Sequence, residues 1–338
     1  MSNTDFHLLA TAIGSMPQID PLKACSLIFK YLKEIPAWPQ LPNRSPEEGM
    51  IKQVASGFPA LNIEGNNLLV KKVGQEEAKE LYSAYLNNNV DHYPIREEEA
   101  SGLYTFLELA KPPFEAVKGQ LTGPVTFGLA VNGEAQKPII YDDTLRQMIA
   151  QFLRLKAAWQ EKMLAPLGRT IIFLDEPGMV SYGSAFFNLE PQRVKALINE
   201  VLGGLRGLKG IHCCGNTDWS ILMETNTDII SFDSYNFPES LNPYSEVTKS
   251  FLKKGGAIAW GIVPTDEKSL AKEDASTLKD RLEETMAPLT RNGIPFKELA
   301  RKGLLTPSCG LAMLSPEASE YALGVLDQLS QIMRKRYS

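Results

Sequence analysis

Short apolar runs alternate with longer amphipathic segments along most of the chain. The apolar runs are rich in β-branched residues and have the length of buried strands; they span residues 7–13, 35–41, 116–121, 170–174, 209–213, 228–232, 257–261 and 304–307. The longer segments carry apolar residues at three- and four-residue spacing, which predicts helices over 22–33, 76–87, 97–110, 145–164, 191–202, 244–254, 275–286 and 316–334. This alternation predicts an α/β fold with a parallel sheet covered by helices.

Eight predicted strands in 338 residues fit a single (β/α)8 TIM barrel, with residues 1–338 forming one catalytic domain. The largest insertion follows the second strand, spans about residues 42–89, and holds a predicted hairpin around 61–70 and a helix. The alternative is an open doubly wound sheet, whose first turn normally reads GxGxxG. The first turn here is Ile13-Gly14-Ser15-Met16-Pro17, which favours the barrel.

Composition excludes several classes of protein. The net charge is -5, and no basic run is interleaved with aromatic residues, so no nucleic-acid partner is expected. No segment approaches the roughly 20 apolar residues of a membrane span, and the first residues lack the basic and apolar parts of a signal peptide. We therefore expect a soluble, cytoplasmic protein with a small-molecule substrate and no membrane partner.

The small number of cysteines and histidines narrows the chemistry. Four cysteines in a chain of this length are core residues, nucleophiles or metal ligands rather than a disulfide framework. A zinc site of three histidines would need every histidine in the chain, because there are only three. A metal site, if present, is therefore expected to mix imidazole with thiols.

Reactive residues gather where predicted strands end, which is where barrel enzymes carry their chemistry. These strand ends read Gly14-Ser15, Asp175-Glu176-Pro177, His212-Cys213-Cys214, Asp233-Ser234 and Ser308-Cys309-Gly310. A scatter over helix faces and strand starts would be expected if the residues had only structural roles.

His212, Cys214 and Cys309 form the candidate metal site. His212 and Cys214 are two residues apart, so an extended backbone directs both side chains to one side and Cys213 to the other. One imidazole and two thiolates suit zinc, with an oxygen ligand or the substrate in the fourth position. The alternative is a core strand of small residues with a hydrogen-bonded histidine. Asp233 is either the fourth ligand or a cap for the following turn.

The two adjacent carboxylates at the end of the fourth predicted strand have two interpretations. Either one of Asp175 and Glu176 binds the ammonium group of a ligand, or the two carboxylates are solvated or cap the next helix. Cys25 lies in the first predicted helix and is expected to fill the core.

Six motifs together resemble the C-terminal catalytic domain of cobalamin-independent methionine synthase, within the superfamily that includes uroporphyrinogen decarboxylase and corrinoid-dependent thiol methyltransferases. They span nearly the whole chain and read Ile13-Gly14-Ser15-Met16-Pro17, Leu121-Thr122-Gly123-Pro124-Val125-Thr126, Leu174-Asp175-Glu176-Pro177, His212-Cys213-Cys214, Ile230-Ser231-Phe232-Asp233 and Pro307-Ser308-Cys309-Gly310-Leu311. Each motif is weak alone, and the ordered set is specific.

The resemblance implies a barrel with a catalytic zinc ion. His212, Cys214 and Cys309 match three zinc ligands of the family, and Asp233 stands where the family has a glutamate ligand. The resemblance also implies that Gly14-Ser15 holds the carboxylate of an amino-acid substrate and that Asp175 holds its amine. The implied reaction is methyl transfer to the thiol of homocysteine, which yields methionine.

One departure from the family pattern concerns the methyl donor. The resemblance implies a histidine after the seventh strand that protonates the leaving folate, but that loop reads Trp260-Gly261-Ile262-Val263-Pro264-Thr265. Losing a general acid is expected to slow such a reaction on the order of 10²–10⁴-fold. Methylcobalamin needs no proton at the departing atom, so the sequence favours methylcobalamin or a methylated corrinoid protein as donor.

Three other activities stay open. The chain could methylate another thiol such as coenzyme M, act as a uroporphyrinogen decarboxylase-like enzyme, or bind a corrinoid or a metal without catalysis. The decarboxylase needs cationic residues for several substrate carboxylates, and the end of the first strand offers none.

Overall fold

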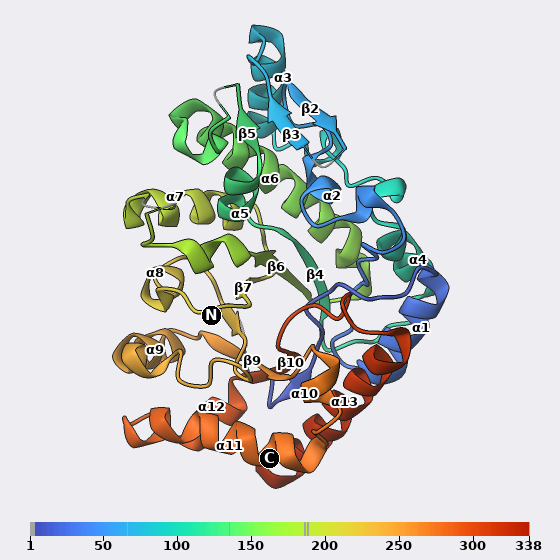
Figure 1. Cartoon of the computed structure of the whole chain (residues 1–338), viewed down its shortest axis with the longest axis vertical. Coiled ribbons are helices and arrows are strands. Elements are labelled where there is room, and N and C mark those ends of the chain that lie inside the picture. The colour runs from blue at the N-terminus through green and yellow to red at the C-terminus, as the bar shows by residue number, and fades with distance from the viewer. Residues whose placement is uncertain (1–3, 66, 135, 186, 188, 338) are drawn as a thin grey trace.

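A curled, seven-stranded parallel sheet forms the centre of the computed structural model, which describes residues 4–337 apart from 66, 135, 186 and 188 (Figure 1). The strand order is β1-β10-β9-β8-β7-β6-β4. The strands are β1 (Leu9–Ala10), β4 (Val117–Thr122), β6 (Thr170–Asp175), β7 (Leu208–Cys213), β8 (Ile229–Phe232), β9 (Ala257–Val263) and β10 (Gly303–Pro307). Most neighbouring strands are consecutive in the chain, as expected for repeated strand–helix units.

Helices cover the outer side of the sheet (Figure 1). They are α1 (Pro21–Tyr31), α4 (Ser101–Leu109), α5 (Pro124–Ala130), α6 (Asp143–Leu164), α7 (Pro191–Leu202), α8 (Trp219–Met223), α9 (Ser245–Lys253), α10 (Glu267–Leu270), α11 (Ala275–Arg291), α12 (Phe296–Arg301) and α13 (Pro316–Tyr337). Each of the eight predicted helices is present. Among the described residues, no helix is both long and apolar enough to cross a membrane.

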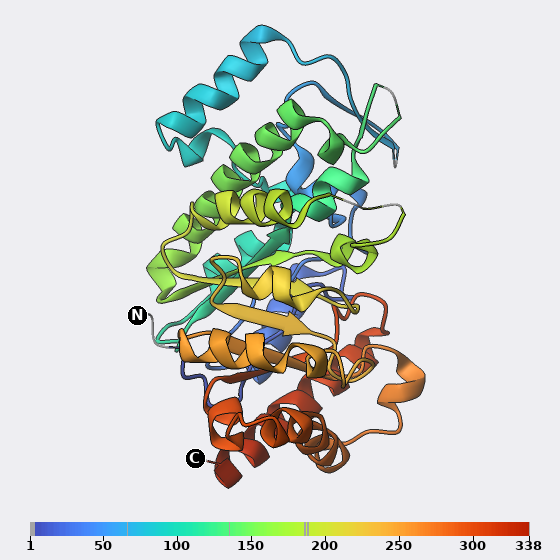
Figure 2. The same ribbon diagram turned by 90° about the vertical axis from the view of Figure 1, so that its left-hand side faces the viewer.

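The hairpin and the long helix of the predicted insertion lie at one end of the long axis, whereas its first residues reach the centre of the molecule (Figure 2). The insertion holds α2 (Lys52–Ala55), the antiparallel pair β2 (Leu61–Glu64) and β3 (Asn67–Val70), and α3 (Gln75–Leu86). The short strand β5 (Asn132–Gly133), from outside the insertion, pairs with β3 and joins the hairpin to the rest of the chain. The predicted hairpin around residues 61–70 is therefore confirmed.

The first predicted strand is shorter than expected. His7 and Leu8 have φ angles of 50° and 60°, which an extended strand does not allow, so β1 begins only at Leu9. The backbone nitrogens of His7 and Leu8 instead donate to the carbonyl oxygens of Arg301 and Gly303.

The prediction of a regular strand over residues 35–41 was wrong. This segment makes only isolated parallel bridges, Ala37 with Lys118 and Gln40 with Ser15. Pro36 and Pro39 have no backbone N–H, so they interrupt the hydrogen-bonded ladder of a strand. The segment nevertheless lies against both edges of the sheet, because Lys118 N donates to Pro36 O and Gln40 N donates to Gly14 O.

The interior of the curled sheet changes from apolar to polar along the strands. A buried cluster made mostly by early strand residues fills its amino-terminal part and consists of Phe6, Leu9, Ile35, Ala116, Ile171, Phe173, Leu208, Ile229, Ala257, Ala259 and Leu304. Later positions on the strands hold buried polar side chains, among them Asp175, His212 and Ser231. The fold thus brings the strand-end residues together at one edge.

Candidate metal centre and substrate cavity

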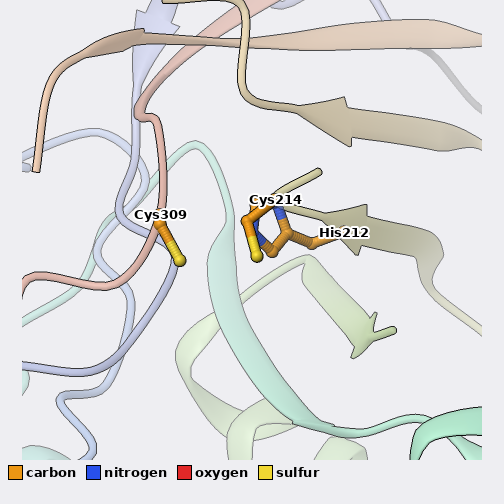
Figure 3. Close-up of side chains that lie close together, drawn as sticks. All are labelled: His212, Cys214 and Cys309. Atoms are coloured by element: carbon orange, nitrogen blue, oxygen red, sulfur yellow. The ribbon is translucent and has the colours of Figure 1, made fainter. Parts of the chain in front are cut away.

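His212, Cys214 and Cys309 meet at the carboxyl ends of β7 and β10 (Figure 3). One potential ligand atom from each residue lies within 4.8 Å of the other two. Ligand atoms of a tetrahedral zinc site with bonds of about 2.0–2.3 Å are about 3.5–3.8 Å apart. The three side chains would therefore need to approach by only about one ångström to share an ion.

The imidazole of His212 offers a free nitrogen to this cluster. Its Nδ1 is 2.9 Å from Ser231 Oγ, whereas its Nε2 is buried and has no hydrogen-bond partner among the described residues. A buried nitrogen without a partner is unfavourable unless a ligand, water or ion completes it. The arrangement therefore fits a metal ligated through Nε2.

The two thiols form a coupled pair. A hydrogen bond from the Cys309 thiol is the main cause that lowers the pKa of Cys214. The thiolate of Cys214 and burial raise the pKa of Cys309. The two sulfurs are thus joined by a hydrogen that a divalent cation bound to both would displace. Two sulfurs and one imidazole are a donor set that suits zinc.

Asp233, the predicted fourth ligand, lies outside this cluster of ligand atoms. One of its carboxylate oxygens accepts a hydrogen bond from Asn236 N at 2.8 Å and the other from Asn236 Nδ2 at 2.7 Å. Burial raises the pKa of Asp233. These contacts match the alternative interpretation, in which Asp233 caps the turn after β8.

A cavity of about 160 Å³ opens onto the cluster. Its described lining consists of Ile13, Ser15, Gln40, Pro42, Glu48, Met50, Asp175, Pro177, His212, Cys214, Cys309 and Gly310. None of these residues is a lysine or an arginine, and two are acidic. The cavity therefore favours a cationic group over an anionic one.

Asp175 ends β6 and faces this cavity, as predicted. Its Oδ1 is buried and has no hydrogen-bond partner among the described residues. Burial raises the pKa of Asp175 to about 6, although nearby His212 and Lys118 oppose the shift. Lys118 is itself buried, and burial lowers its pKa to about 8. Asp175 thus has a free oxygen for a ligand.

Gly14 and Ser15 lie beside the cavity, which Ser15 lines. Gly14 has a φ of 149°, and a Cβ atom there would lie 2.6 Å from the side chain of Gln120, so only glycine fits. Ser15 O accepts a hydrogen bond from Leu311 N at 2.8 Å, which joins this turn to the loop that carries Cys309.

Glu176 points away from the cavity. Its carboxylate accepts hydrogen bonds from Val125 N at 2.9 Å and from Thr126 N and Oγ1 at 2.7 Å, at the first turn of α5. Burial raises its pKa to about 7. Glu176 thus caps α5, an earlier helix rather than the next one, and its predicted substrate contact stays a prediction.

Glu48, in the insertion, is a cavity residue that the sequence did not reveal. It is 1% exposed, and its Oε1 accepts hydrogen bonds from Ser101 Oγ at 2.7 Å and Arg44 at 3.0 Å. Its Oε2 is buried without a partner among the described residues. Glu47 and Glu48 look alike in the sequence, and only the fold turns one of them inward.

The other two cysteines have the expected positions. Cys213 is fully buried, and its Sγ contacts Gly215 O at 3.5 Å rather than the cluster. Cys25, on α1, is fully buried in the main core. The prediction that Cys25 fills the core is confirmed.

No model of a known protein family matches the chain. Methionine synthase from Methanocaldococcus jannaschii is 28% identical over 202 residues, an alignment that covers 60% of this chain and 60% of that relative.

Solved structures share the fold at lower identity. A B12-independent methionine synthase from Shewanella sp. W3-18-1, in complex with selenomethionine, aligns with a TM-score of 0.59 and 16% identity over 97% of this chain and 98% of its own. A putative vitamin-B12 independent methionine synthase from Listeria monocytogenes aligns with a TM-score of 0.54 and 14% identity over 92% of this chain and 86% of its own. The chain is thus related in sequence to a methionine synthase and shares its fold with B12-independent methionine synthases.

Proposed function

We propose that the chain is a zinc-dependent methyltransferase that methylates the thiol of homocysteine to form methionine. The observation that carries this proposal is the His212, Cys214 and Cys309 cluster, which opens onto a small cavity with two buried carboxylates. The named methionine synthase relative and the two structural neighbours support the same reaction. When bound, zinc would keep the sulfur of the substrate as a thiolate at neutral pH.

We propose three protein ligands and leave the fourth position to the sulfur of the substrate. Catalytic zinc sites commonly have three protein ligands and one exchangeable position. Asp233 stays outside the proposed set because Asn236 already binds both of its carboxylate oxygens.

The acidic cavity would select an amino-acid thiol. Asp175 and Glu48 each have a buried oxygen without a partner among the described residues, and together these oxygens could hold an ammonium group. The Gly14-Ser15 turn would hold the carboxylate. Coenzyme M carries a sulfonate and no ammonium, and a porphyrin substrate carries several carboxylates, so both fit this lining less well than homocysteine does.

The methyl donor would remain at the mouth of the cavity, because about 160 Å³ accommodates a small amino acid and not a folate or a corrinoid. Two observations point to different methyl donors. The loop after β9 has no histidine, which favours methylcobalamin or a corrinoid protein, whereas both structural neighbours are described as B12-independent, which argues against it. The assay of methyl transfer therefore compares methylcobalamin with methyl-folate.

We also propose that the curled sheet is a closed (β/α)8 barrel within a single domain. Residues 36–40 would act as the irregular eighth strand between β4 and β1. Their hydrogen bonds to Lys118 and Gly14 support this arrangement.

Substrate binding and turnover should be tested separately. The sulfur-to-metal absorption that Cys214 and Cys309 give cobalt-substituted protein should increase on addition of homocysteine, and coenzyme M should cause no increase at the same concentration. Zinc-loaded protein is then assayed for methionine with methylcobalamin and with methyl-folate. Cys309→Ser should abolish both signals, whereas Cys213→Ala, a matched control beside the cluster, should retain them. Undiminished turnover in metal-free protein would overturn the proposal.

A further inference from the structure

Ser231 lies beside His212 in the interior of the sheet. The two residues are register partners on the adjacent parallel strands β8 and β7. Ser231 is fully buried and His212 is 3% exposed. On the other side, the register partner of Ser231 is Ala259, which offers no polar group.

The hydroxyl of Ser231 has one side-chain hydrogen bond among the described residues, to His212 Nδ1 at 2.9 Å. A neutral imidazole carries its hydrogen on one ring nitrogen and a lone pair on the other. If Nδ1 donates its hydrogen to Ser231 Oγ, the lone pair lies on Nε2. Nε2 is the nitrogen left without a partner.

A serine in this position calls for an explanation. Ile229, two residues earlier on the same face of β8, belongs to the apolar cluster that fills the sheet interior. A buried hydroxyl without a partner is unfavourable by about 1–3 kcal/mol. An alanine would therefore suit this layer if the residue served packing alone.

We propose that Ser231 is a positioning residue that fixes the tautomer and ring orientation of His212, so that Nε2 presents its lone pair to the metal. This inference rests on the proposed zinc site. It adds Ser231, on β8, as a residue that holds one of the zinc ligands in place. Metal-ligating histidines usually donate their second ring nitrogen to such a partner, and removal of the partner typically weakens metal affinity about 10–100-fold.

Nuclear magnetic resonance of ¹⁵N-histidine-labelled, metal-free protein tests the tautomer without zinc or catalysis. The chain has only three histidines, so variants at His7 and His92 assign the spectrum. At pH 8, where an ordinary imidazole is neutral, wild-type His212 should carry its hydrogen on Nδ1. Ser231→Ala should show a mixture of tautomers or the other one. An Nε2–H tautomer in the wild type, or an unchanged spectrum in Ser231→Ala, would overturn the proposal.

Zinc affinity, measured by competition with a chromophoric chelator, provides the second readout. Ser231→Ala should bind zinc about 10–100-fold more weakly than the wild type, and Ser231→Thr, which keeps the hydroxyl, should stay close to it. Ser330→Ala is the matched control, because Ser330 is also buried and its hydroxyl donates to Leu8 O far along the chain from the cluster. Wild-type protein that binds no zinc refutes the proposed function. Wild-type protein that binds zinc with Ser231→Ala at equal affinity refutes only the role of Ser231.

Discussion

Individual buried charges distinguish the cavity from the rest of the interior. Glu48 and Asp175 approach it from the insertion and from β6. Arg44 pairs with one oxygen of Glu48 at 3.0 Å, and each carboxylate keeps one buried oxygen without a hydrogen-bond partner among the described residues. Buried carboxylates are unfavourable unless they are paired or hydrogen bonded. Their unpartnered oxygens therefore indicate a site that is completed by a cationic ligand.

Replacement of Glu48 by glutamine should weaken binding of the amino-acid thiol. A hydrogen bond to a charged group contributes about 1.5–3 kcal/mol, so Glu48→Gln should raise KM for homocysteine about 10–100-fold with a smaller change in kcat. Steady-state kinetics at saturating donor measure both parameters. Glu47→Gln changes the exposed neighbouring glutamate and should leave KM unchanged. An equal rise in both variants would contradict the proposed contact.

Lys156 should give the free energy of unfolding a characteristic pH dependence. It is fully buried on α6, donates to Pro94 O at 2.9 Å, and lies 5.1 Å from the ring centre of Phe152. Burial lowers its pKa from 10.5 to about 8. Between these values the unfolded chain holds a proton that the folded chain has released, so stability from this group rises with pH.

Urea unfolding at pH 7 and at pH 9.5 tests this sign. From the lower to the higher pH, the wild type should gain about 2 kcal/mol relative to Lys156→Met. Lys162 is on α6 as well, but it is exposed and pairs with Asp91, so Lys162→Met should show no such difference. A relative loss of stability in the wild type would contradict the predicted shift.

Secondary-structure elements are joined at the site by buried side chains rather than by backbone alone. Glu176 follows β6 and caps α5, while its backbone nitrogen donates to His212 O at 2.7 Å. A Cβ atom at Gly123, just before α5, would lie 2.3 Å from the Glu176 carboxyl group, so a glycine is required for this contact. The cap thus fixes α5 against the strands that carry the site.

Removal of this cap should destabilise the fold. Glu176→Ala leaves two buried backbone N–H groups and one hydroxyl without their acceptor, so the free energy of unfolding should fall by about 3 kcal/mol. Glu190→Ala is a suitable control, because Glu190 precedes α7 without a side-chain capping hydrogen bond. Its effect should stay within about 0.5 kcal/mol in the same urea titration. Equal effects would argue against the capping role.

The whole chain brings together the proposed ligands that follow β7 and β10, two strands that lie far apart in sequence and three places apart in the sheet order. A metal bound there would act as a crosslink between distant segments. Because the unfolded chain presents no preformed site, metal binding should stabilise the folded state.

Zinc should therefore raise the free energy of unfolding. At a free zinc concentration 100 times the dissociation constant, the gain should be about 2.7 kcal/mol. Unfolding of metal-free and zinc-loaded protein measures the difference. Cys309→Ser should lose most of the gain and Cys213→Ala should keep it. A zinc effect of the same size in Cys309→Ser would place the metal elsewhere.

The amino-acid pattern was sufficient for most elements of the fold. Seven of the eight predicted strands and all eight predicted helices form, because their apolar spacing reflects burial that local sequence already encodes. The segment at residues 35–41 was misread, since apolar content predicted a strand while Pro36 and Pro39 prevent a regular ladder. The short helices α2, α5, α8, α10 and α12 carry too few turns for a periodic signal.

The sequence alone predicted that His212, Cys214, Cys309 and Asp175 would come together, because residues at strand ends converge at one edge of a parallel sheet, and all four line the same cavity. The direction of each side chain depended on contacts between distant segments. Glu176 turns to α5, Asp233 binds Asn236, and Glu48 enters the cavity from the insertion. Sequence position does not fix the direction of a loop side chain relative to a distant site. Which carboxylate reaches the cavity is therefore decided only by the packing of the folded chain.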